Sequence, residues 1–154
     1  MNGNVTKYLN QQVLTASPSK LVYMLYDRAI SSLREAIAAI EEGEIEKRWK
    51  ANNRAQEIIQ HMWATLNVDD SGEIGDNLNR LLPYMMLRLP DVDLQNDPEP
   101  AREVIILLEP LRDAWRQIAL NGVAECGAVR SAAEAAASAA IHSEIPTSRT
   151  IISA

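Results

Sequence analysis

Residues 15–30 read "TASPSKLVYMLYDRAI", and this stretch decides the fold. Ser17 followed by Pro18 is typical of a helix start, because serine caps helix N-termini and proline is tolerated at the first helical position. From Leu21 to Tyr26, six large or apolar side chains follow one another without a polar break. A surface helix with one solvent-exposed face would interrupt such a row. We therefore expect both sides of this helix to be covered, by its own chain or by a partner.

The helix that begins here carries two neighbouring apolar stripes. One stripe has spacings of four and three residues and comprises Val22, Tyr26, Ala29, Leu33, Ala36 and Ile40. The second stripe repeats every seven residues and comprises Tyr23, Ile30 and Ile37. Two adjacent stripes predict a wide apolar face. Gly43 is expected to end the helix, since glycine favours the position that follows a helix.

Three more helices are predicted, at about 44–66, 72–89 and 98–118, and no segment has the alternating pattern of a strand. The second helix has a stripe of Ile45, Trp49, Asn52, Ala55, Ile59, Met62 and Leu66. Asn52 is its polar member and needs a hydrogen-bond partner if it is buried. Residues 90–100 are expected to form a loop, with Asp97 as the cap of the last helix. Short links between amphipathic helices predict an all-α, antiparallel four-helix bundle.

The ends of the chain differ in composition from the bundle. We expect an N-terminal cap segment over residues 1–16, the bundle over 17–120 and an Ala-rich tail over 121–154. Alanine favours helices, but its small side chain buries little area, so the tail is predicted to be either partly helical or disordered. Pro83 and Pro110 fall inside predicted helices, where we expect kinks unless the helix boundaries lie elsewhere.

Composition narrows the class of function. The 154 residues are 47% hydrophobic and carry a net charge of −6, which argues against nucleic acid and anionic membranes as partners. No apolar run approaches the roughly 20 residues that span a bilayer, so no membrane insertion is expected. The single cysteine, Cys126, rules out an internal disulfide. With no signal-peptide pattern, these features predict a soluble protein of the cytosol.

The residues that enzymes use are scarce. His61 and His142 are far apart in sequence, and no histidine or cysteine has the spacing of metal ligands. The acidic stretch that begins at Asp91 has Asn96 where a calcium loop of the EF-hand type needs glycine. We expect no enzyme activity, no cofactor and no metal site.

Four segments in order resemble the FliS family, the flagellin-specific export chaperones, over about residues 5–118. The stretch from Tyr8 through "SP" to "MLYDRA" is similar to the family's N-terminal signature. "GEIGDNL" from Gly72, "YMMLRL" from Tyr84 with the "LQND" that follows, and "EVIILLEPLRDAW" up to Trp115 resemble its last two helices and the loop between them. The chain departs from the pattern at Arg28, Pro83, 90–93 and after about Leu120.

The resemblance implies a cytosolic chaperone of a bacterium, which binds the C-terminal segment of flagellin, prevents premature polymerisation and delivers it to the flagellar type III export gate. It also implies that the N-terminal segment lies over a hydrophobic cleft and docks to the export machinery. By resemblance this role carries over to Tyr8 only, as the matching aromatic. The leader's further apolar positions, which we expect in the same cap or docking segment, are Leu9, Val13 and Leu14.

A groove lined by leucine, methionine and isoleucine would bury the apolar face of such a client helix. The residues expected in or near this flagellin-binding groove are Met24, Leu25, Met62, Leu66, Leu78, Leu82 and Met85. The alternative is a structural or oligomerisation module that buries its apolar face against a copy of itself, although we favour a monomer.

Overall fold

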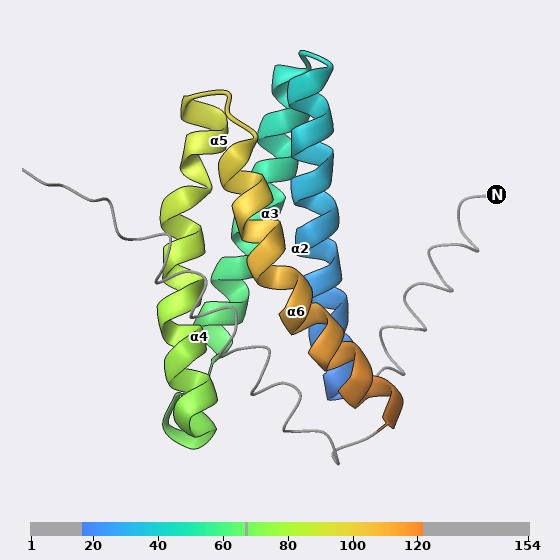
Figure 1. Cartoon of the computed structure of the whole chain (residues 1–154), viewed down its shortest axis with the longest axis vertical. Helices are drawn as coiled ribbons and strands as arrows, with labels where there is room; N and C mark the ends of the chain where they lie inside the picture. Colours follow the sequence, from blue (N-terminus) through green and yellow to red (C-terminus); the bar gives the residue numbers. More distant parts are fainter. Residues whose placement is uncertain (1–16, 67, 122–154) are drawn as a thin grey trace, which may run out of the picture.

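The computed structural model describes residues 17–66 and 68–121, without the side chains of 68–71. All regular structure in this part is helical: α2 (Pro18–Glu41), α3 (Ile45–Thr65), α4 (Val68–Arg88), α5 (Pro90–Leu94) and α6 (Glu99–Asn121). The four long helices run alternately up and down, so that neighbours are antiparallel (Figure 1). The prediction of an all-α, antiparallel bundle is therefore confirmed.

The predictions for the two ends of the chain lie outside the described residues. They comprise the cap segment 1–16, with Tyr8, Leu9, Val13 and Leu14, and the tail from 122 to 154. The division of the chain into three segments stays a prediction.

Both ends of α2 follow from its sequence. At the start, the Ser17 hydroxyl accepts a hydrogen bond from the Lys20 N–H at 3.3 Å, as a helix cap does. At the end, Gly43 has a φ of 73°, a left-handed conformation that glycine adopts without strain. The N–H groups of Gly43 and Glu44 bind the carbonyls of Ile40 and Ala39 at 3.1 and 2.8 Å. These bonds satisfy carbonyls of the last turn, which is the Schellman way of ending a helix.

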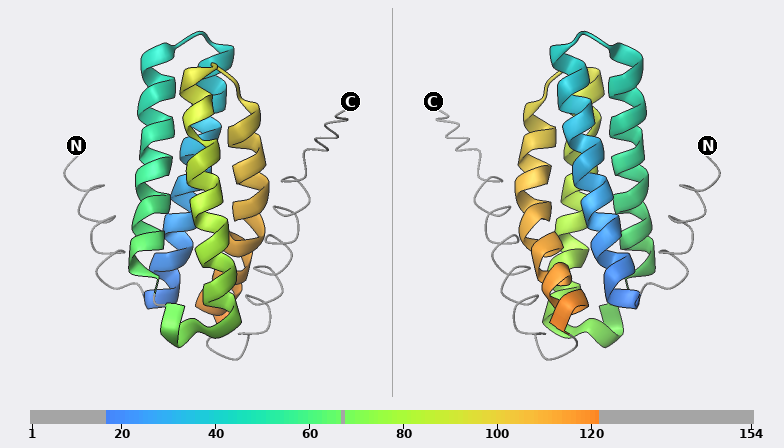
Figure 2. Two further views of the ribbon diagram at one scale, coloured as in Figure 1. Left: turned by 90° about the vertical axis from the view of Figure 1, so that its left-hand side faces the viewer. Right: turned by 90° about the vertical axis from the view of Figure 1, so that its right-hand side faces the viewer.

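Helix α2 packs against α3 on one side and against α6 on the other (Figure 2). Its buried residues are Tyr26, Ala29, Ile30, Ser32, Leu33, Ala36 and Ala39. This two-sided contact explains the wide apolar face. The row from Leu21 to Tyr26 is covered unevenly, since Tyr26 is buried, Leu21 is 37% exposed and the four residues between them are half-buried.

Both prolines lie in the interior of long helices. Pro83 is inside α4 and Pro110 is inside α6. The residue in α4 whose backbone is not helical is Gly72, with φ 56° and ψ −139°. The first turn of α4 is therefore set off from the rest at a glycine, where the missing Cβ permits a positive φ.

The prediction of a loop over residues 90–100 was wrong for its first half. Residues Pro90–Leu94 form the short helix α5, and Val92 is completely buried. Proline is pre-organised for the first position of a helix, and Asp91 and Asp93 favour its positive N-terminal end. The predicted cap at the start of α6 is confirmed, because the Asp97 carboxylate accepts a hydrogen bond from the Glu99 N–H at 3.0 Å.

The apolar stripe of α3 is buried over only part of its length. Ile45 is 68% exposed and Trp49 is 54% exposed, although both were predicted to face the core. The stripe is covered from Asn52 onward, where α4 and α5 pack against α3. Helical periodicity defines this face correctly but does not show how far along it the neighbouring helices extend.

Asn52 is completely buried and joins α3 to α5. Its amide group donates to the Leu89 carbonyl at 2.9 Å and to Asp93 Oδ2 at 2.7 Å. Arg48, one turn earlier, donates to Asp93 Oδ1 at 3.0 Å and also to the Asn96 side chain. Asn96 has a positive φ of 53° in the turn between α5 and α6. The hydrogen bonds of Arg48 and Asn52 thus hold α5 and the following turn against α3.

Replacing Asn52 by Ala should lower the free energy of unfolding by about 2 kcal/mol. The substitution leaves a buried carbonyl and one carboxylate oxygen without their donor. Asn53→Ala is the matched control, because the Asn53 amide bonds only Glu57 on the same helix. The control should change stability by less than about 0.5 kcal/mol. Urea unfolding of the two variants measures both values, and equal stabilities would contradict this role of Asn52.

Candidate functional site: a pocket between the four long helices

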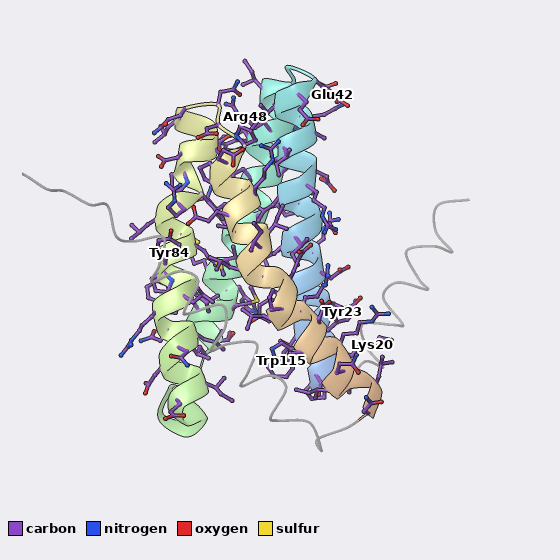
Figure 3. The ribbon with its side chains drawn as sticks, viewed as in Figure 1. Lys20, Tyr23, Glu42, Arg48, Tyr84 and Trp115 are labelled. Atoms are coloured by element: carbon purple, nitrogen blue, oxygen red, sulfur yellow. The ribbon has the colours of Figure 1, made fainter. Side chains whose placement is uncertain are left out.

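A largely apolar pocket of about 160 Å³ lies at the end of the bundle where α2 begins and α3 ends. All four long helices contribute to it. Its lining residues are Val22, Leu25, Tyr26, Met62, Thr65, Leu66, Leu78, Leu82 and Trp115. Figure 3 labels Trp115 on the last turns of α6, beside the first turns of α2. The pocket is open to solvent and so differs from a packing defect of the core.

The structure brings together five of the seven residues predicted for the groove. These five are Leu25, Met62, Leu66, Leu78 and Leu82. Met85 has no exposed surface and belongs to the core, so it does not line this pocket. Met24 is half-buried on α2 and does not line it either. Whether the five residues bind a client stays a prediction.

Sequence reasoning missed four lining residues, namely Val22, Tyr26, Thr65 and Trp115. Val22, Tyr26 and Trp115 belong to apolar stripes, which made them candidates for the core. Their place near the end of a helix was the available signal, because side chains there have fewer neighbours above or below them. Thr65 carried no signal, since it is a small polar residue at a helix end.

The polar groups of the pocket are few. The Thr65 hydroxyl donates to the His61 carbonyl at 2.9 Å. Burial raises the pKa of the Tyr26 hydroxyl to about 12, and the N–H of Trp115 opposes this rise. The pocket therefore suits an apolar group that brings at most one or two polar atoms.

A second hollow, of about 310 Å³, lies between α2 and α3 near the other end of the bundle. It is lined by the alanines Ala38, Ala39 and Ala51 and by the charged residues Glu35, Glu42, Lys47, Lys50 and Arg54. Arg54 and Glu35 form an ion pair at 3.0 Å across it. Positively and negatively charged side chains around this hollow already lie close to one another. The hollow itself is explained by the small side chains of the alanines.

The described part of the chain has no cluster of three histidine, cysteine or acidic residues that could hold a metal ion. Within that part, none of the helices is long and apolar enough to cross a bilayer. The site is thus a concave, largely apolar pocket, which is typical of a binding site.

Comparison with known proteins identifies relatives of the chain. A family model described as "Flagellar protein FliS" matches residues 1–122. The flagellar secretion chaperone FliS of Salmonella typhimurium is 38% identical over 107 residues, which are 69% of this chain and 79% of that protein. The protein of the same name from Vibrio cholerae is 31% identical over 122 residues, which are 77% of this chain and 90% of that protein. The protein of the same name from Bacillus subtilis is 34% identical over 112 residues, which are 73% of this chain and 83% of that protein.

The Tyr26 hydroxyl should make stability depend on pH in alkaline solution. In the unfolded chain it loses its proton near pH 10, whereas in the folded chain it keeps the proton until about pH 12. The folded state binds more protons between these values. The contribution of Tyr26 is therefore fully present below pH 10 and is lost, by up to about 3 kcal/mol, as the pH rises through 12.

Urea unfolding of the wild type and of Tyr26→Phe from pH 8 to 11.5 tests this expectation. Phenylalanine keeps the ring but has no proton to lose, and all other residues are the same in the two proteins. The wild type should lose stability faster than the variant above pH 10. Parallel curves for the two proteins would contradict the raised pKa.

Proposed function

The chain belongs to the FliS family, and on this premise we propose that it is an export chaperone which binds the C-terminal segment of flagellin. In this role it prevents premature polymerisation of flagellin and delivers it to the flagellar type III export gate. It acts in the bacterial cytosol, as a monomer that forms a one-to-one complex with its client. FliS is a family of chaperones and not of enzymes, which agrees with the expectation that this chain is not an enzyme.

The observation that carries this proposal is the apolar pocket shared by the four long helices. It continues the half-buried row of α2, so that Val22 and Leu25 line it from one side and the buried Leu78 and Leu82 form its floor. An amphipathic client helix binds such a surface with its apolar face, and its side chains fill pockets of this kind. We expect Met62 and Leu66, at the end of α3, to form the third wall of the contact.

The N-terminal segment is proposed to cover the same surface when no client is bound. The apolar positions for this role are Tyr8, Leu9, Val13 and Leu14. Residue 17 lies directly before the helix that carries Val22 and Leu25, so the segment is tethered close to the pocket. A tethered segment has a high effective concentration, and even a weak contact would compete with the client. The segment would also dock to the export gate once the client has displaced it.

Co-purification with the flagellin of the same organism tests the proposed function. Intact flagellin should bind, and flagellin without its C-terminal segment should not. Light scattering after size exclusion distinguishes the alternative, in which the chain is a structural module that associates with itself. A monomer that becomes a one-to-one complex supports the chaperone. A stable homodimer that ignores flagellin contradicts it.

Leu25→Asp should weaken binding of the flagellin C-terminal segment at least about tenfold, because it places a charge on the apolar wall of the pocket. Leu87→Asp is the matched control, since Leu87 is 77% exposed on α4 and is not a pocket residue. Calorimetry gives both affinities, and circular dichroism shows whether each variant is folded.

If Leu25→Asp fails to fold, Leu66→Ser tests the same wall, because Leu66 is half-buried and follows the last residue of α3. Equal affinity of the folded pocket variant and the Leu87 control would exclude this pocket from the client interface.

Deleting residues 2–14 should speed association of the flagellin segment by several-fold, because the competing cover is removed. Deleting 122–154 should change the rate little, since an Ala-rich tail buries less area than Tyr8 and Leu9. Stopped-flow binding to the two folded truncations measures the rates. A large acceleration from the tail deletion alone would assign the cover to the tail.

A further inference from the structure

The hollow between α2 and α3 has a floor of alanines and lies away from the apolar pocket. Its volume is about 310 Å³, and the floor consists of Ala38, Ala39 and Ala51. Ala39 and Ala51 are each 3% exposed, so little more than a methyl group separates the two helix backbones from solvent there. A third helix with small side chains could therefore approach both backbones closely. We call this hollow the alanine groove.

Charged side chains form the rims of the alanine groove. Glu35 and Glu42 lie on the α2 side, and Lys47, Lys50 and Arg54 lie on the α3 side. No large apolar side chain of the described residues lines the groove. The groove thus suits a segment that combines a face of small side chains with polar edges.

The chain itself contains one such segment, beyond the end of α6. Eight of the thirteen residues from 128 to 140 are alanine, and Val129 has the largest apolar side chain among them. The family model matches residues 1–122, so this segment lies beyond the part that defines the family. On a helix, spacings of four and three residues would give it one small-residue face, which comprises Val129, Ala133, Ala136 and Ala140.

The segment is long enough to reach the alanine groove from the end of α6. Arg112 of α6 pairs with Asp27 of α2 at 3.8 Å, so Asn121 lies near the first turns of α2, at the end of the bundle opposite to Glu42 (Figure 3). The rise from there to Ala38 is about 30 Å along α2. Residues 122–127 can span about 20 Å when extended, and a helix over 128–140 would add about 20 Å.

The apolar pocket at the near end of the bundle is also within reach, but it suits this segment less well. Its wall carries large side chains such as Leu25, Leu82 and Trp115. Alanine methyl groups would leave much of the pocket unfilled, and unfilled space contributes no dispersion energy. In the alanine groove, methyl groups of the segment would meet methyl groups of the floor. The match in side-chain size therefore favours the groove.

We propose that residues 128–140 form a helix that lies in the alanine groove and packs against both α2 and α3. An isolated helix of this length is marginal in water, so it forms together with its contact. The segment covers a surface apart from the apolar pocket and leaves that pocket open. This inference does not depend on the proposed function, because none of its contacts involves a client.

A spin label on the segment tests where it lies in the full chain. Cys126→Ser with Ala135→Cys places one nitroxide on the side of the helix opposite to the small-residue face. In nuclear magnetic resonance spectra, the label should broaden the amide signals of Ala38 and Lys50 and spare that of Leu66 at the apolar pocket. Broadening at Leu66 instead of Ala38, or at neither residue, would overturn the proposal.

A mixture of two chains shows whether the segment binds its own chain. Spin-labelled chains without nitrogen-15 are mixed with nitrogen-15 chains that carry no label. The signals of Ala38 and Lys50 should then keep their intensity. Loss of intensity in this mixture would mean that the tail of a second copy occupies the groove, and it would overturn the proposed contact within one chain.

A pair of tail variants measures what the contact contributes to stability. Ala136→Asp puts a charge on the small-residue face and should lower the melting temperature by about 2–4 °C. Ala135→Asp puts the same charge on the opposite side of the helix and is the matched control, with an expected shift below about 1 °C. Scanning calorimetry measures both shifts. Equal melting temperatures of the two variants would contradict a docked segment.

Filling the groove tests the same contact from the side of the bundle. Ala38→Leu adds a larger side chain at an exposed position, so the core stays intact. It should lower the melting temperature as much as Ala136→Asp does, and the double variant should be no less stable than either single one. Ala64→Leu is the control, since Ala64 is exposed on α3 and lines neither hollow. Additive losses in the double variant would overturn the proposal.

Discussion

Helix α2 must bury apolar side chains against α3 and α6 at the same time, and the other helices are arranged around this requirement. Its buried surface alternates large residues with small ones. Ala29 and Ala36 have no exposed surface and allow neighbouring backbones to approach closely, whereas Ile30 and Leu33 fill the space between the helices. The stability of the fold thus depends on α2, which is covered by α3 on one side and by α6 on the other.

The covering of α2 is incomplete at its first turns, and this incompleteness creates the candidate site. Tyr26 is buried, but the residues just before it are only half-buried. At this level α3 ends at Thr65 and α6 is close to its own end, so each helix contributes fewer side chains. Apolar residues that would be core in the middle of the bundle therefore line a pocket here. The same apolar residues that stabilise the fold thus also form the site that we propose for the client.

The opposite end of the bundle is closed by polar contacts. Asn52 and Arg48 bind the carboxylate of Asp93, and Asn52 also binds the carbonyl of Leu89. These bonds fix where the chain turns from α4 through α5 toward α6. The two ends of the bundle thus differ in kind, with a hydrogen-bonded polar cluster at one end and a largely apolar pocket at the other.

The sequence by itself determined the four long helices and the caps at Ser17, Gly43 and Asp97, because periodicity and capping act over a few residues. It predicted Leu25 and Leu82 as groove residues, since apolar stripes specify a face. It could not show that Leu82 and Met85 are buried while Leu25 is only half-buried, or that Trp49 is exposed. Depth along a face depends on where neighbouring helices end. Only the tertiary structure decided this.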